Sequence, residues 1–242
     1  MSIENKKVVI IGATSGIGEE LSLIYASKGY RVGITGRRTE LLLNIQNQFP
    51  SNIVIESFDV TGKENIIHVQ SLIEKLGGMD ILIYNSGYGD TSKNLEWDIE
   101  NRTTQVNVNG FIEIVCFAYN YFLNQGHGQI VGTSSIASIK GSSRAPAYAA
   151  SKAFMANYLE GLYIKARNSK ANLAVTDLQP GFVDTALVSG TPMFWAATPR
   201  KAAEQIFNAI RSKKKKVYIT KRWWFIAQLL KIMPNFIYRK FG

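Results

Sequence analysis

Residues 8–18 read VVIIGATSGIG and decide the fold of this 242-residue chain. The apolar run Val8–Ile11 suits a strand that is buried on both faces. Gly12, Gly16 and Gly18 follow it in a G-x-x-x-G-x-G spacing, and a helical pattern begins directly behind them. Glycines at such positions let a backbone turn tightly, approach a pyrophosphate and pack a helix closely on the strand. The stretch predicts a dinucleotide-binding start, although a plain strand-to-helix turn can look the same.

The alternation of strand and helix continues along the chain. Short β-branched or apolar runs predict strands at 7–11, 31–35, 53–58, 80–84, 129–133, 172–178 and 216–219. Helix-length segments cover 17–28, 39–48, 63–76, 99–124, 147–168 and 199–211. The pattern predicts the α/β class, with a Rossmann-type doubly wound parallel sheet of about seven strands and helices on both faces. We expect one dinucleotide-binding catalytic domain over residues 1–220 and a basic, aromatic tail over 221–242.

Composition narrows the class of protein. A hydrophobic share of 46% with 19% charged residues is ordinary for a globular chain and excludes disordered or collagenous sequences. Cys116 is the single cysteine, which excludes a disulfide framework, and His68 and His127 leave few ligands for a metal, so no metal site is expected. The start of the chain lacks a secretory pattern and no apolar run is long enough to span a bilayer. We therefore expect a cytoplasmic protein.

The net charge of +10 is confined to one end of the chain. Residues 1–210 hold 18 basic and 18 acidic residues, whereas residues 211–242 hold ten basic residues and no acidic one. A nucleic-acid-binding domain normally carries its basic patch on the fold itself. The neutral body therefore predicts no nucleic-acid partner, and the excess charge concerns the tail alone.

The second predicted strand ends in Thr35-Gly36-Arg37-Arg38, without an acidic residue. A carboxylate at this point would hold the ribose 2′-hydroxyl of NAD(H) and would repel a 2′-phosphate. A guanidinium can bind phosphate oxygens in a fork. Arg37, helped by Arg38, therefore predicts NADP(H) in preference to NAD(H); the alternative is a solvated pair at a helix start.

Tyr148 and Lys152 are four residues apart within a predicted helix, so their side chains share one face. A nearby ammonium favours tyrosinate, and we expect Lys152 to lower the pKa of Tyr148 toward neutral pH, as a general acid–base needs. Ser135, at the end of a predicted strand, can hydrogen-bond the same substrate oxygen. Any Tyr and Lys at this spacing have the same geometry, and a surface contact is the plainer interpretation of the pair alone.

These motifs resemble the short-chain dehydrogenase/reductase family over about residues 5–220. The resemblance implies a catalytic set of Asn107, Ser135, Tyr148 and Lys152. It implies cofactor contacts at Gly12, Thr14, Ser15, Gly16, Ile17, Gly18, Arg37, Arg38, Asp59, Val60, Asn85, Ser86, Gly87, Tyr148, Lys152, Pro180, Gly181, Val183 and Thr185. Ile11 and Tyr84 depart from the family, which usually has Thr and Asn there; both positions are structural, so the departures concern hydrogen bonds between strand ends.

The resemblance implies an NADPH-dependent oxidoreductase that reduces a ketone or aldehyde to an alcohol, or catalyses the reverse reaction. Tyr148 would donate a proton, Ser135 would polarise the oxygen, Lys152 would bias the tyrosine and hold the nicotinamide ribose, and Asn107 would hold a relay water. The family also implies a homodimer or homotetramer. The alternative is a non-catalytic NADP(H)-sensing or scaffold protein, which has no need of all four groups.

Two segments leave alternatives open. Residues 186–195, mostly apolar, form either a lid over a hydrophobic carbonyl substrate or a packed crossover. No charged residue in the segment would bind an anionic substrate; Arg144, just before Tyr148, is the nearest candidate and is expected to be solvated. In the tail, Gln228, Lys231 and Asn235 make a narrow polar stripe on an otherwise apolar helix entered by Trp223 and Trp224. That helix either packs on the body or a partner subunit and walls the substrate pocket, or lies peripherally in an anionic membrane surface.

Overall fold

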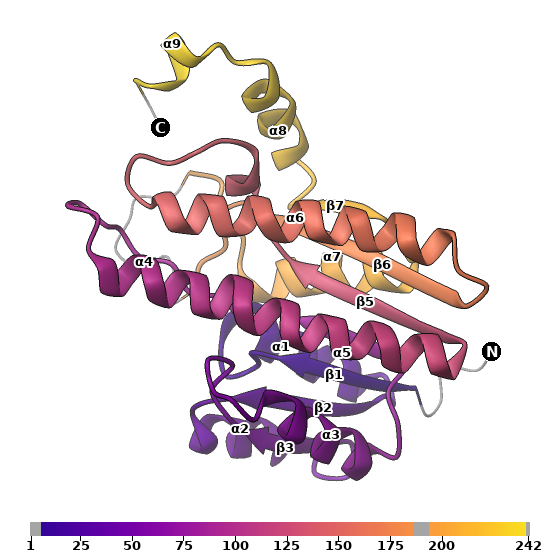
Figure 1. Cartoon of the computed structure of the whole chain (residues 1–242). Helices are drawn as coiled ribbons and strands as arrows, with labels where there is room; N and C mark the ends of the chain where they lie inside the picture. The colour runs from indigo at the N-terminus through magenta and orange to yellow at the C-terminus, as the bar shows by residue number, and fades with distance from the viewer. Residues whose placement is uncertain (1–5, 186–193, 241–242) are drawn as a thin grey trace.

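The computed structural model describes residues 6–185 and 194–240. These residues form one parallel sheet of seven strands in the order β3-β2-β1-β4-β5-β6-β7 (Figure 1). The strands are β1 (Lys7–Ile11), β2 (Arg31–Gly36), β3 (Ile53–Ser57), β4 (Ile81–Tyr84), β5 (His127–Thr133), β6 (Asn172–Pro180) and β7 (Lys216–Ile219). The predicted α/β sheet and the positions of its strands are confirmed.

Helices cover both faces of the sheet, as expected for a doubly wound fold. One face packs against α1 (Gly16–Ser27), α2 (Thr39–Gln46) and α7 (Pro199–Arg211). The other packs against α3 (Asn65–Leu76), α5 (Gly110–Gln125) and α6 (Pro146–Arg167). Alternate residues of β1 divide between the two cores, because successive side chains of a strand point to opposite faces: Val8 and Ile10 join the first, and Val9 and Ile11 join the second.

The helix predicted over 99–124 differs from the prediction because it is interrupted. It consists of α4 (Trp97–Thr104), a π-helical turn η1 (Gln105–Asn109) and α5. Beside the turn, the buried Tyr84 hydroxyl donates a hydrogen bond of 2.7 Å to the Val106 carbonyl. A π turn widens the helix by one residue and often lies at a functional site. Here it carries Asn107.

The strand ends place the candidate site. The chain runs from β1 outward to β3 and then returns to β4 on the other side of β1, so the strand order reverses between β1 and β4. In open α/β sheets, ligands bind at the carboxyl ends of the strands beside such a reversal. The segments after β1, β4, β5 and β6 meet at this edge.

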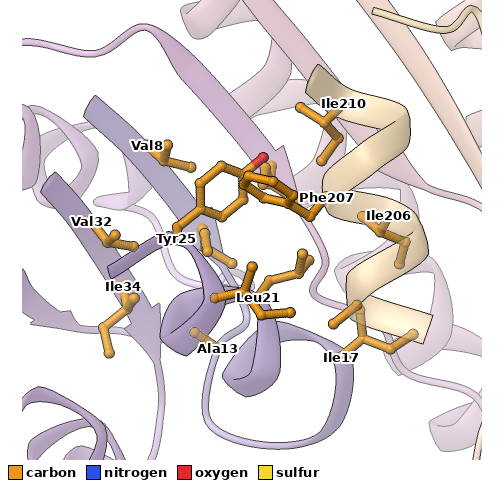
Figure 2. Close-up of a cluster of buried hydrophobic side chains, with 14 of the residues drawn as sticks. Val8, Ala13, Ile17, Leu21, Tyr25, Val32, Ile34, Ile206, Phe207 and Ile210 are labelled. Carbon is orange, nitrogen blue, oxygen red and sulfur yellow. The ribbon is translucent and has the colours of Figure 1, made fainter. Parts of the chain in front are cut away.

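The core on the α1 and α7 face is built around aromatic rings. Figure 2 shows Tyr25 of α1 and Phe207 of α7 in contact beside Val8 of β1 and Val32 and Ile34 of β2. Their ring centroids lie 4.9 Å apart at an interplanar angle of 66°. Edge-to-face pairs of this kind add to the free energy of apolar burial.

We predict that Phe207→Ala destabilises the fold by about 3–5 kcal/mol, because it removes a buried ring and leaves a cavity between α1 and α7. The free energy of unfolding is measured in urea. Ile67→Ala, on the exposed side of α3, is the control and should cost less than about 0.5 kcal/mol. Equal effects of the two substitutions would contradict this assignment of the core.

Candidate active site

A cavity of about 680 Å³ lies at the carboxyl edge of the sheet. It extends from Arg37 and Asp59 at one end to Tyr148 and Lys152 at the other. All the predicted site residues line it except Gly16, Gly18 and Asn107. Those in its wall are Gly12, Thr14, Ser15, Ile17, Arg37, Arg38, Asp59, Val60, Asn85, Ser86, Gly87, Ser135, Tyr148, Lys152, Pro180, Gly181, Val183 and Thr185.

The glycine turn needs glycine at each of its three positions. Gly12 and Gly16 have φ angles of +86° and +61°, which side chains rarely tolerate. A Cβ at Gly12 would lie 2.5 Å from the Ser86 hydroxyl, and one at Gly18 would overlap the Gly12 carbonyl. The turn therefore brings α1 and the end of β4 closer to β1 than any side chain would allow.

The N-terminus of α1 can receive an anion. Ser15 precedes the helix in an extended conformation, and its side chain does not cap the first turn. The first N–H groups of a helix have no partner within the helix, and the helix dipole favours negative charge. Gly16 lies against Thr185, because a Cβ on it would come within 2.8 Å of the Thr185 methyl. Thr14, Ser15, Ile17 and Thr185 line the cavity around this helix end.

The two arginines after β2 differ in their contacts. Arg38 donates to the Thr14 hydroxyl at 2.7 Å and to the Ser15 hydroxyl at 3.0 Å, so it lies beside the glycine turn. Arg37 pairs with Asp59 at 3.3 Å, and both side chains are partly exposed. Burial favours a higher pKa for Asp59, but hydrogen bonds from Thr61 and the Arg37 charge outweigh it and lower the pKa. Both guanidinium groups remain at the cavity edge.

Ser135, Tyr148 and Lys152 meet at the other end of the cavity. Ser135 follows β5; its hydroxyl accepts from the Ala137 N–H at 3.1 Å and lies near enough to Tyr148 to influence the pKa of the phenol. Lys152 lies one helical turn after Tyr148, with its ammonium 5.7 Å from the centroid of the phenol ring. The same ammonium donates to the Thr133 carbonyl at 2.9 Å. A serine, a phenol and an amine thus share one wall, as the sequence predicts.

The expected lowering of the Tyr148 pKa is wrong. Burial raises the pKa of Tyr148, and the nearby Ser135 hydroxyl opposes that rise only in part. Burial also lowers the pKa of Lys152 to about 8, against the opposing charge of Asp177. Desolvation therefore outweighs the pairwise attraction on which the sequence argument relied. At neutral pH the phenol is a proton donor and the amine is a cation.

Asn107 lies behind this wall, not in it. Its fully buried amide group donates to the Tyr88 carbonyl at 2.7 Å and to the Ser151 hydroxyl at 2.9 Å. Its Oδ1 accepts from the Tyr88 N–H at 2.9 Å and keeps one lone pair for a further donor. Both Oδ1 and the Lys152 ammonium lie beside Gly87, within 3.7 Å and 3.4 Å of the position of a Cβ there.

The two departures from the family motif leave the strand ends connected. Asn85 donates to the Gly12 carbonyl at 2.9 Å and accepts from the Thr133 hydroxyl at 3.3 Å, so it joins the ends of β1, β4 and β5. Tyr84 instead directs its hydroxyl to the π turn, and Ile11 is fully buried. Hydrogen bonding between the strand ends thus does not need Thr at 11 or Asn at 84.

The structure adds residues to the site that the sequence argument missed. Gly89 lies flat against the Tyr148 ring, where a Cβ would overlap it. Arg102 also lines the cavity, with its guanidinium 4.8 Å from the Tyr88 ring centroid, whereas the exposed Arg144 does not line it. The position of Gly89, two residues after the Asn85-Ser86-Gly87 motif, was a signal in the sequence that it belongs to the site. Arg102 gave no such signal, because only the folding of the chain brings α4 to the cavity.

Residues 186–193 lie outside the residues that the structure describes. The two interpretations of segment 186–195, a lid or a packed crossover, therefore stay predictions.

The tail is described to residue 240, and its beginning packs on the body. The ring of Trp223 is buried against Gly181 and against Phe182, another cavity residue, at a centroid distance of 5.4 Å to Phe182. Arg222 donates to the Ala196 carbonyl at 3.4 Å. The first turn of the tail helix therefore supports one cavity wall.

In the described part of the chain, no three His, Cys, Asp or Glu side chains gather in a way that could hold a metal ion. The cavity instead joins a glycine turn and an uncapped helix N-terminus to a Ser-Tyr-Lys wall. Such a combination suits a dinucleotide and a small reacting molecule together.

Comparisons with known proteins agree with this geometry. An uncharacterized oxidoreductase from Staphylococcus saprophyticus is 31% identical over 222 residues, which cover 87% of this chain and 93% of that protein. A short-chain dehydrogenase/reductase from Burkholderia phymatum, solved with NAD, superposes with a TM-score of 0.85 at 20% identity over 95% of this chain and 94% of its own. The protein ElxO, solved with NADP bound, gives 0.79 at 23% identity over 90% and 98%.

At these identities the two solved structures establish the shared fold. The family model for short chain dehydrogenase matches residues 6–192, which include every predicted catalytic and cofactor-binding position. Match and fold agree, and the chain belongs to the short-chain dehydrogenase family of oxidoreductases.

Proposed function

We propose that the protein is an NADPH-dependent oxidoreductase that reduces the carbonyl group of a hydrophobic ketone or aldehyde to an alcohol, or runs the reverse reaction. The convergence of Ser135, Tyr148 and Lys152 on one wall of the dinucleotide-sized cavity carries the proposal. We assign the reaction to a catalytic domain of residues 1–220, with residues 221–242 as its tail.

The residues around the cavity fit a nicotinamide dinucleotide. The glycine turn and the N-terminus of α1 would hold the pyrophosphate, Asp59 and Val60 the adenine, and Lys152 with Thr185 the nicotinamide end. Arg37 and Arg38 would bind a 2′-phosphate, since the two residues that follow β2 are both basic; Arg37 would then turn from Asp59 to the phosphate. The dinucleotide, when bound, supplies the hydride.

The chain's own groups would handle the proton. Tyr148, whose raised pKa keeps it protonated at neutral pH, donates its proton to the carbonyl oxygen as charge develops there. Ser135 holds that oxygen by a hydrogen bond, and the Lys152 cation stabilises the resulting phenolate. Asn107 fixes the segment after β4 through Tyr88 and offers Oδ1 to a relay water.

The protonation states favour reduction at neutral pH, because a phenol with a raised pKa is a donor. The cavity wall near Ser135 includes Ile136, Phe182 and Val183, which suit an apolar substrate.

Exposed apolar side chains on α5 and α6, such as Leu123, Phe154 and Ile164, support the inference of a homodimer or homotetramer through these helices.

We predict that Tyr148→Phe lowers kcat for carbonyl reduction by about a hundredfold to ten-thousandfold, because it removes the proton donor. The assay follows NADPH oxidation with a panel of ketones and aldehydes. Tyr163→Phe, on the same helix, is the control and should leave kcat unchanged. Tight NADPH binding without turnover of any carbonyl compound would instead favour the non-catalytic sensor.

The pH dependence of reduction should reflect Lys152. Below a pKa of about 8 the amine is a cation, and above it the stabilising charge is lost. The value of kcat/KM should therefore be level below pH 8 and should fall about tenfold per pH unit above it. Lys152→Arg keeps the positive charge at high pH, so the remaining activity of this variant should not fall above pH 8. If the variant lost activity above pH 8 as the unmodified chain does, the role of Lys152 would be refuted.

Cofactor preference should depend on the two arginines. We predict that Arg37→Ala with Arg38→Ala raises KM for NADPH by about 10–100-fold, as expected for lost charged hydrogen bonds, and leaves KM for NADH within about twofold. Initial rates with both cofactors test this. Arg31→Ala, at the opposite end of β2, is the matched control. Equal losses for both cofactors would show that the arginines do not recognise the 2′-phosphate.

A further inference from the structure

The tail forms two helices that project from the body. Figure 1 shows α8 (Trp223–Ile232) and α9 (Asn235–Tyr238) standing away from the sheet at the top of the view. Both are anchored at defined points: Trp223 packs on Gly181, and the Tyr238 hydroxyl donates to the Gly141 carbonyl at 2.5 Å. The pair therefore presents a surface of fixed shape.

One side of this surface is apolar and exposed. Trp224, Phe225, Leu229 and Ile232 lie within an arc of about 140° on α8, at 100° per residue. Phe225 is 68% exposed and Ile232 is 79% exposed, whereas Trp223 and Ala227 on the opposite side are buried. Phe236 on α9 is 65% exposed. We call the five exposed side chains, Trp224, Phe225, Leu229, Ile232 and Phe236, the apolar tail face.

All the charged residues of the tail are cations. Lys221, Lys231, Arg239 and Lys240 are all exposed, and residues 211–242 contain no acidic residue. Tryptophan, other large apolar side chains and flanking cations together suit the interface of an anionic bilayer. A membrane span is a different matter: the described helices include none that is long and apolar enough to cross.

The charge also argues against a second copy of the chain as the covering partner. A twofold contact through this face would bring both sets of tail cations together, and the tail has no carboxylate to neutralise them. An anionic lipid surface neutralises them and takes up the apolar side chains. We propose that the apolar tail face binds the surface of an anionic membrane, with α8 and α9 lying in the headgroup region.

Co-sedimentation with vesicles tests the proposal on the full chain. We expect the protein to pellet with vesicles of phosphatidylcholine mixed with phosphatidylglycerol, to pellet less with phosphatidylcholine alone, and to be released by salt. Phe225→Ser with Ile232→Ser should weaken binding by about tenfold for each side chain. Leu43→Ser with Ile67→Ser, exposed apolar positions on α2 and α3, is the control and should bind as the unmodified chain does.

A charge test has its own matched control. Lys231→Gln with Lys240→Gln should weaken binding to the anionic vesicles by about fivefold for each lysine. Lys213→Gln with Lys214→Gln removes the same charge at the opposite end of β7 and should have a smaller effect. Equal effects of the two double variants would mean that unspecific attraction by the net charge accounts for the binding, and would overturn the proposal.

The depth and the alternative partner are tested by two further measurements. Brominated phosphatidylcholine in the vesicles should quench Trp224 fluorescence, so Trp224→Phe should remove most of the quenching, whereas Trp97→Phe, at an exposed position on α4, should not. The mass in solution should be equal for the unmodified chain and for Phe225→Ser with Ile232→Ser. A lower mass with unchanged vesicle binding would assign the face to a second copy and overturn the proposal.

Discussion

The close approach of α1 to the end of β1 is the constraint on which the rest of the site depends. It requires glycine at position 18, because a side chain there would overlap the Gly12 carbonyl. The same carbonyl accepts a hydrogen bond from the side-chain amide of Asn85. Asn85 in turn accepts from Thr133, so the ends of β1, β4 and β5 are held together. Ser135 and the carbonyl that binds Lys152 follow from this junction.

The polar groups beneath the cavity share one buried network. Asp177 is almost fully buried and accepts from the Ser134 hydroxyl at 2.5 Å and from Gln179 at 2.7 Å, while Lys216 approaches within 3.9 Å. Its charge opposes the loss of the Lys152 proton. A buried cation is tolerated here because a carbonyl and a carboxylate on neighbouring strands compensate part of its desolvation.

The sequence predicted the parts that depend on local pattern. Strands buried on both faces read as continuous apolar runs, and the motif residues gather because parallel strands end at one edge. Features that depend on contacts between distant residues could not be predicted from the sequence. These are the Tyr84 contact beside the π turn, the burial that raises the pKa of Tyr148, and the position of Arg102 at the cavity. Trp223 and Trp224 are adjacent in sequence, and only the packing on Gly181 distinguishes their environments.

The contact between Trp223 and Gly181 has a consequence for how such chains can diverge. The indole occupies the space that a side chain at 181 would need, so neither residue can be exchanged freely while the other stays. The shape of that cavity wall and the start of the tail are therefore coupled. Loss of the tail would expose Gly181 and uncover that wall of the cavity. A larger residue at position 181 would displace the Trp223 ring, so the tail would have to pack elsewhere on the body.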